Sequence, residues 1–265
     1  MHEKSLSQIY DLIKNYPKDT VIGEFAGRDS VAAILKAMED SSVNNILPIA
    51  SFAPTEYGDF DILESNYEKM VERAKELYGN SKTIFPLIYY SDFDLWSVLN
   101  GRFVDYILKK YEFYTPCMGC HAYFHLLRVP IAIKVSNRII AGERESHDGR
   151  IKLNQIAECL DAYERIAKDL GTELMMPIRY MEDGDEVKKL IGWNWEEGKK
   201  HQTCAFSGNY KNIDDSVNYD KELVKKFIDD YLYPASIALG KLIINEENPT
   251  REKMVQALKN RGELL

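Results

Sequence analysis

Residues 21–35, with the sequence VIGEFAGRDSVAAIL, decide the fold class of this chain. They predict a short strand, a loop of small and polar residues at positions 25–30, and a helix whose apolar residues recur at helical spacing. Further strands are predicted at residues 45–51, 83–90, 138–141 and 174–180. Because helical patterns separate these strands, we expect βαβ units and a parallel sheet covered on both faces. The sequence therefore predicts an α/β fold with a doubly wound, mainly parallel five-stranded sheet of the Rossmann-like kind.

Helical patterns fill most of the rest of the chain. Helices are expected at residues 31–38, 61–78, 93–111, 120–135 and 151–170. From about Asp220 onward no strand pattern occurs, and apolar residues fall on helical faces. The sequence thus predicts an α/β domain over residues 1–215 and a helical C-terminal extension over residues 216–265.

The composition is that of a protein with a core, because 45% of the 265 residues are hydrophobic, which excludes disorder of the whole chain. The 34 Lys and Arg residues against 42 Asp and Glu give a net charge of −8, which argues against a protein that grips nucleic acid with its entire surface. No run approaches the roughly 20 apolar residues of a membrane helix. The first residues also lack the apolar core of a signal peptide. We expect a cytoplasmic protein that does not bind a membrane.

The loop at residues 25–30 lies where the first strand ends and the first long helix begins. Ligands of open α/β sheets bind beyond the carboxyl ends of the strands. Small residues there let backbone N–H groups approach a phosphate, and the helix N-terminus adds a favourable dipole. Asp29 and Ser30 also suit helix capping, so a capped helix after a tight turn explains the same residues. Neither a Walker A pattern nor G-x-G-x-x-G can be laid onto this loop.

The hexapeptide Phe25-Ala26-Gly27-Arg28-Asp29-Ser30 resembles the PP-loop, Ser-Gly-Gly-x-Asp-Ser, of the N-type ATP pyrophosphatase superfamily. Gly27, Asp29 and Ser30 match this motif, whereas Phe25 and Ala26 replace its first Ser and first Gly. The resemblance implies an adenine nucleotide α-hydrolase-like fold in which the 25–30 loop binds ATP and Mg²⁺. It also implies cleavage of ATP to AMP and pyrophosphate, with Asp29 and Ser30 as catalytic residues and an adenylated intermediate.

Other segments resemble this superfamily in the same order, over roughly residues 20–210. Residues 51–59, including Phe52, stand where such proteins hold the nucleotide base, and Gly142 opens a polar loop after the fourth strand. Residues 176–180 resemble the Pro-Leu-Arg segment of the thiolating members. The resemblance implies that Arg144 and Arg179 neutralise phosphate charge, with Arg144 taking part in catalysis; surface ion pairs explain these two arginines equally well.

Cys117, Cys120 and Cys204 raise several alternatives for a metal or redox site. The string Cys117-Met118-Gly119-Cys120-His121 matches the attachment motif of c-type haem, which is attached outside the cytoplasm. A tetrahedral Zn²⁺ site is a second alternative, because His121 or His125 could join the two cysteines. Redox-active or merely structural thiols are a third. Cys159 instead shares a helical face with apolar residues, which predicts a place in the core.

Loops that are far apart in sequence meet at one edge of a parallel sheet, so Cys204 can approach Cys117 and Cys120. This layout resembles the tRNA 2-thiocytidine and 2-thiouridine synthetases. The resemblance implies that the three cysteines hold a [4Fe-4S] cluster with one iron free, and soft thiolates suit such clusters.

Together these resemblances imply an ATP-dependent sulfur transferase that activates a carbonyl or carboxyl group and inserts sulfur. Its acceptor is expected to be a tRNA or a small molecule, or another protein's cofactor, and sulfide or a sulfur donor supplies the sulfur. A homodimer is compatible with the sequence. Residues 199–201 could contact a phosphate, although such a run also suits a solvated loop. The alternatives are a phosphoadenylylsulfate-reductase-like enzyme, which would need a cysteine beyond Cys204, and a non-catalytic nucleotide or iron–sulfur module.

Overall fold

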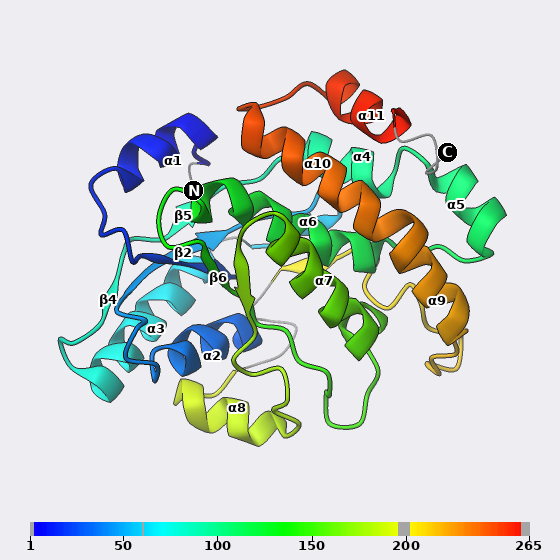
Figure 1. Ribbon diagram of the computed structural model, residues 1–265. Coiled ribbons are helices and arrows are strands. Elements are labelled where there is room, and N and C mark those ends of the chain that lie inside the picture. The colour runs from blue at the N-terminus through cyan, green and yellow to red at the C-terminus, as the bar shows by residue number, and fades with distance from the viewer. Residues whose placement is uncertain (1–2, 60, 196–201, 261–265) are drawn as a thin grey trace.

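The computed structural model describes residues 3–59, 61–195 and 202–260 (Figure 1). Its main sheet has six strands that all pair in parallel. These strands are β1 (Val21–Phe25), β2 (Asn45–Ala50), β4 (Thr83–Ile84), β5 (Ile88–Tyr89), β6 (Arg138–Ile140) and β7 (Glu173–Met175). The prediction of an α/β fold with a mainly parallel sheet is therefore confirmed.

The strand order is β4-β2-β1-β6-β7, and β5 also pairs with β2. The expected strand at residues 83–90 is thus split into two short strands. The split falls at Pro86, which has no N–H group for the ladder. The chain runs outward from β1 through β2 and then returns to the other side of β1 as β6. This reversal creates a crevice at the carboxyl ends of β1 and β6, which is where doubly wound sheets bind ligands.

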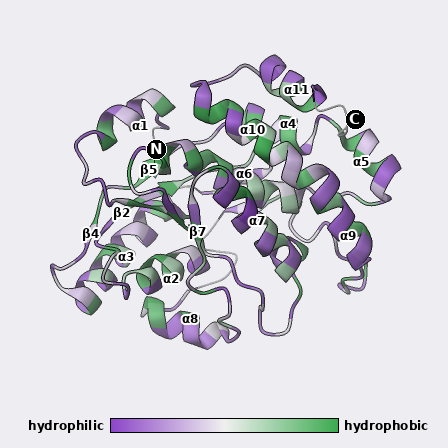
Figure 2. Cartoon of the chain, in the orientation of Figure 1, coloured by the Kyte–Doolittle hydropathy of each residue, from purple (hydrophilic) through white to green (hydrophobic). Residues whose placement is uncertain are grey.

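Helices cover both faces of the sheet, and alternate residues of the strands belong to two apolar cores. One core holds α2 (Arg28–Ala37), α3 (Ile62–Tyr78) and α8 (Gly184–Ile191) against the sheet, on its lower side in Figure 1. The opposite core includes α1 (Leu6–Ile13), α4 (Phe93–Asn100), α5 (Val104–Tyr111), α6 (Pro116–Ala132) and α7 (Ala157–Asp169). Figure 2 shows hydrophobic residues gathered on the strands and inner helix surfaces, with hydrophilic residues outward.

Several predicted elements are shorter or broken in the structure. The single helix expected at 93–111 ends at Asn100, with Gly101 as its C-cap, and resumes as α5. The expected strand at 174–180 ends at Met175, because Pro177 begins a turn. Conversely, α6 starts earlier than expected, with Pro116 in its first turn, so that Cys117 belongs to the helix.

The C-terminal part is helical and packs on the opposite core. It consists of α9 (Lys221–Phe227), a π-helical segment (Ile228–Leu232), α10 (Tyr233–Asn245) and α11 (Arg251–Lys259). Helix α10 contacts α6 and α7, and α11 contacts α4. These helices therefore share one apolar core with the α/β part of the chain. None of the helices in the described ranges combines the length and apolarity that crossing a bilayer requires.

Candidate active site

The 25–30 loop joins β1 to α2 at the crevice of the sheet. Gly27 is the N-cap of α2, and no side chain caps its first turn. Ser30 closes the loop instead, because its hydroxyl donates to the Gly27 carbonyl (2.7 Å) and accepts from the Ala26 N–H (2.9 Å). Asp29 lies in the first turn of the helix. The loop therefore leaves its N-terminal amides available to an anion, while the Ser30 hydroxyl is engaged in holding the turn.

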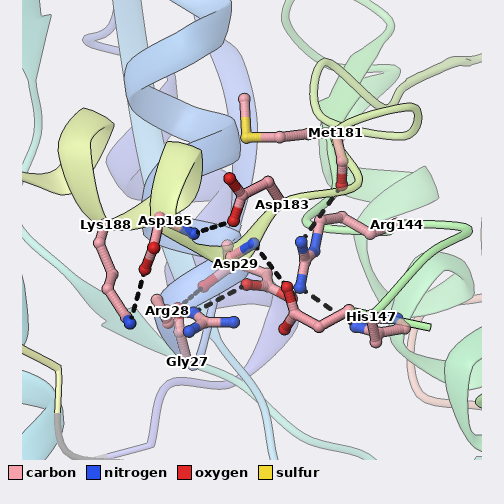
Figure 3. Close-up of polar contacts among 12 residues, drawn as sticks. Gly27, Arg28, Asp29, Arg144, His147, Met181, Asp183, Asp185 and Lys188 are labelled. Atoms are coloured by element: carbon pink, nitrogen blue, oxygen red, sulfur yellow. Dashed lines mark hydrogen bonds and ion pairs between the residues drawn. The ribbon is translucent and has the colours of Figure 1, made fainter. Parts of the chain in front are cut away.

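The segment after β6 packs directly against this loop. A Cβ atom on Gly142 would lie 2.5 Å from the Ser30 nitrogen, so only glycine fits here. Arg144 is completely buried, and its Nε donates to Asp29 Oδ2 at 3.3 Å. Its Nη1 donates to the Met181 carbonyl (3.2 Å) and its Nη2 to His147 Nδ1 (3.3 Å), as Figure 3 shows. Arg144 thus ties together the loops that follow β1, β6 and β7.

The expectation that Arg144 acts on phosphate stays a prediction. In the structure its guanidinium donates to Asp29, to two backbone carbonyls and to His147, so it holds Asp29 in place. For Arg179 the structure shows the ion-pair alternative. Its guanidinium binds three carboxylates, those of Glu145 (2.6 Å), Asp161 (2.5 Å) and Glu164 (3.2 Å). Although burial would lower the pKa of Arg179, these carboxylates raise it, so the arginine serves an ion-pair network.

A cavity of about 800 Å³, here called the large cavity, opens at the 25–30 loop. Besides all six loop residues, its walls include Ser51, Gly142, Arg144, His147 and Lys152. Phe52 does not line it: the Phe52 ring is buried and stacks near Tyr89 at 6.1 Å between ring centroids. The expectation that Phe52 contacts a nucleotide base is therefore corrected, and the adjacent Ser51 is the residue that reaches the cavity from β2.

Sequence reasoning missed a buried chain of charged residues in the wall of the large cavity. His125 Nδ1 lies 2.7 Å from Glu24 Oε1, and His125 Nε2 lies 3.4 Å from Glu143 Oε1. His121 Nδ1 contacts the same Glu143 oxygen at 2.7 Å. Burial would lower the pKa of His125, but Glu24 and Glu143 raise it to about 9. Burial would likewise raise the pKa of Glu143, but His121 and His125 hold it well below its usual range. His125 and Glu143 are therefore both ionised at neutral pH.

The sequence contained a signal for the two histidines of this buried chain of charged residues, but none for the glutamates that contact them. His121 and His125 stand four residues apart, so they lie on one face of a helix. Glu24 and Glu143 are polar residues at the carboxyl ends of β1 and β6. Only the strand order shows that these four side chains meet beside the crevice.

Cys117, Cys120 and Cys204 line a second, smaller cavity of about 250 Å³, here called the cysteine cavity. The first two lie near the N-terminal end of α6. Cys204 lies in β8 (Thr203–Cys204), which pairs antiparallel with β3 (Glu56–Tyr57). Burial, and then the nearby Cys204, raise the pKa of Cys117 to about 11, so this thiol is neutral at pH 7 until a ligand displaces its proton.

Two of the three sulfurs accept hydrogen bonds from N–H groups. The Trp96 indole donates to Cys120 Sγ at 3.2 Å, and the Phe206 amide donates to Cys204 Sγ at 3.4 Å. Hydrogen bonds of this kind tune sulfur ligands of iron–sulfur clusters, and three sulfurs around one cavity suit a soft metal centre. In the part of the chain that the structure describes, however, no three His, Cys, Asp or Glu side chains form a group that could hold a metal ion.

The histidines considered as zinc ligands both have other partners. His121 lies between Glu143 and Asn154, whose Nδ2 is 2.7 Å from His121 Nε2, and His125 is fully buried beside Glu24. Cys159 is buried and its thiol donates to the Leu153 carbonyl, so its predicted place in the core is confirmed. Residues 199–201, predicted to contact a phosphate, lie outside the described residues.

Comparison with known proteins shows that the chain is similar in sequence to an archaeal protein. An uncharacterized protein of Methanocaldococcus jannaschii, MJ0009, is 43% identical over 224 residues, which cover 84% of this chain and 80% of that protein. This chain belongs to the MJ0009 family. That relative is itself uncharacterized, so membership brings no activity with it. No family model and no solved structure matches the chain.

In this member of the MJ0009 family the two cavities share a wall. His121, Lys152, Gln155 and Tyr210 each line both the large cavity and the cysteine cavity. A ligand that extends through the large cavity from the 25–30 loop to this wall would therefore reach the boundary of the cysteine cavity. The arrangement can bind an anion at a helix N-terminus on one side and present sulfur chemistry on the other.

Proposed function

We propose that this chain is an ATP-dependent sulfur transferase of the PP-loop type, with an adenine nucleotide α-hydrolase-like fold. In the proposed reaction, a substrate oxygen attacks the α-phosphorus of ATP and pyrophosphate leaves. Sulfide, from solution or from a sulfur donor, then adds to the activated carbon, and AMP leaves with the oxygen. The proposal rests on the wall that the large cavity and the cysteine cavity share, because activation and sulfur transfer must occur at one carbon atom.

The 25–30 loop would bind the pyrophosphate part of ATP. Its N-terminal amides have no capping side chain, and the helix dipole favours negative charge there. The Asp29 carboxylate, held by Arg28 (3.2 Å) and Arg144 (3.3 Å), would bind Mg²⁺ at the same place. The loop and the ion would together stabilise the charge of the leaving pyrophosphate.

Cys117, Cys120 and Cys204 would hold a [4Fe-4S] cluster, which supplies an iron with a position open to sulfide. Support for this assignment comes from the common cavity of the three thiols and from the N–H groups of Trp96 and Phe206 that point at two of them. The acceptor is proposed to be a small molecule or a tRNA.

Anaerobically purified protein tests both halves of this proposal. We expect AMP and pyrophosphate to form from ATP with Mg²⁺, and Asp29→Asn, which keeps a hydrogen-bond acceptor for the buried Arg144, to lose this turnover by two orders of magnitude or more. We also expect brown protein with broad absorption near ~400 nm. Each of Cys117→Ser, Cys120→Ser and Cys204→Ser should lose this absorption, and Cys159→Ser should keep it.

Two results would count against the proposal. ATP that binds without forming AMP, with acceptor and sulfide present, would indicate the non-catalytic alternative. Colourless anaerobic protein with one stoichiometric Zn²⁺ would replace the cluster with zinc.

A further inference from the structure

Residues 206–219, here called the strap, lie in the irregular stretch of chain between β8 and α9. The strap crosses the place where the two cavities meet, because Ser207, Gly208 and Tyr210 line both of them. None of its residues is buried, and Ile213 in its middle is fully exposed. A segment with so little buried surface belongs to the part of a protein that opens most readily.

Hydrogen bonds within the strap give it a shape of its own. The Asn209 amide donates to the Phe206 carbonyl at 3.0 Å, and the Lys211 amide donates to the Gly208 carbonyl at 2.9 Å. The Lys211 side chain also pairs with Asp215 at 3.0 Å. Because both partners of each bond lie inside the strap, these bonds persist when the strap moves as a body. Its position over the cavities therefore depends on contacts with the rest of the chain.

Asn209 attaches the strap to the rest of the chain. Its Oδ1 accepts a hydrogen bond from Thr115 Oγ1 at 3.0 Å and another from Cys117 Sγ at 3.4 Å. The same thiol lies 3.8 Å from the Phe206 carbonyl oxygen. Among the described residues, the other hydrogen bonds that leave the strap reach only its chain neighbour Cys204.

The Cys117 thiol is thus one of the two donors that hold Asn209. An amide oxygen accepts from an S–H group, but a sulfur that has given up its proton has nothing to donate. A group that takes the place of the Cys117 proton therefore removes one of these two bonds. What remains is the Thr115 bond and the packing of Tyr210 and Tyr219 at the edge of the opposite core.

We propose that the strap is a lid over the junction of the two cavities, latched through Asn209 by Thr115 and Cys117, and that a group bound to Cys117 releases it. Phe206 and other strap residues line the cysteine cavity together with Cys120, so lifting the strap opens a path to this thiol. The inference goes beyond the proposed function and does not depend on it, because the latch needs neither ATP nor a cluster.

The initial rate at which iodoacetamide alkylates Cys120 measures how often the strap opens. It is determined by peptide mapping of the full-length, chelator-treated protein. Asn209→Ala removes both latch bonds, so we expect Cys120 to react roughly five- to tenfold faster than in wild type. Asn212→Ala is the matched control: the Asn212 side chain bonds Ser216 Oγ within the strap, at 2.9 Å, so the rate should stay within about twofold of wild type.

Two variants of Cys117 test its part in the latch. Cys117→Ala removes one of the two donors and should accelerate alkylation of Cys120 about threefold. Cys117→Ser keeps an O–H donor for Asn209, so its rate should stay close to that of wild type. Cys159, which is buried in the core, is the reference for opening of the whole protein, and its alkylation rate should be the same in every variant.

An unchanged Cys120 rate in Asn209→Ala would overturn the proposal, because the strap would then not control access to the thiols. Equal acceleration of Cys120 and Cys159 would overturn it as well, since the whole protein rather than the strap would be opening. Equal rates in Cys117→Ala and Cys117→Ser would remove Cys117 from the latch.

Discussion

At the scale of single residues, the dominant feature is a protonated histidine held between two carboxylates. His125 is fully buried with Glu24 at 2.7 Å and Glu143 at 3.4 Å, and Arg128 lies 3.7 Å from Glu24. Removing one partner from such a network leaves an uncompensated buried charge, which is strongly destabilising. The network therefore holds β1, β6 and α6 in a fixed relation behind the large cavity.

The raised pKa of His125 predicts a loss of stability at alkaline pH. The folded value is about 9, against an ordinary value of about 6.5 in the unfolded chain. The imidazolium therefore stabilises the fold fully below about pH 6.5, and this contribution is lost as the pH rises through 9. The difference corresponds to at most about 3 kcal/mol. Urea unfolding at a series of pH values should show the free energy of unfolding falling between pH 7 and 9.5.

His125→Gln is the variant that isolates this effect. Buried thiols and tyrosines also destabilise the fold at alkaline pH, so the comparison is the difference in slope between wild type and variant. We expect a shallower fall in the variant, along with lower stability at pH 7. Equal slopes for the two proteins would show that His125 is not protonated in the folded state.

At the scale of elements, the close approach of two loops builds the site. Gly142, after β6, lies against the first turn of α2, with room for no side chain. Gly142→Ala should push the two segments apart, lower the free energy of unfolding by about 1–3 kcal/mol, and weaken ATP binding. Fluorescence titration with ATP and urea unfolding measure the two effects.

Gly149→Asn is the matched control for Gly142→Ala. Gly149 lies on the same segment, with nothing within 4 Å of a Cβ atom, and its φ of +80° is one that asparagine tolerates. ATP binding should be unchanged in this control. If Gly142→Ala binds ATP as wild type does, the packing of this segment on α2 is not needed for the nucleotide.

Sequence patterns anticipated most of these elements because their causes are local. The strand from Val21, the 25–30 loop and the following helix are encoded by neighbouring residues, and so is the core position of Cys159. Partners distant in sequence could not be predicted in this way. The three carboxylates around Arg179 and the burial of Arg144 depend on which loops the sheet brings together.

At the scale of the whole molecule, the packing argues for one cooperative unit. Helix α6 carries Cys117, Cys120 and the two histidines of the buried chain, and its other surface packs on α10. A Cβ atom on Gly240 of α10 would lie 2.3 Å from Leu170 Cδ1 and 3.2 Å from Leu126 Cδ2. The C-terminal helices are thus fitted closely to the elements that bear the site.

Gly240→Val tests this cooperativity, since overpacking at this contact should cost about 1–3 kcal/mol. Trp96 lies on α4, which α11 contacts, whereas Trp193 and Trp195 belong to the core on the other face of the sheet. In a Trp96→Phe background, fluorescence therefore reports on the α/β part, whereas circular dichroism includes α9 to α11. We expect both signals to shift together to lower urea concentration in Gly240→Val. Lys241→Ala, at the exposed neighbouring position, should leave both unchanged. If fluorescence stays at the wild-type midpoint while circular dichroism shifts, the C-terminal helices unfold by themselves and residues 1–215 form an independent domain.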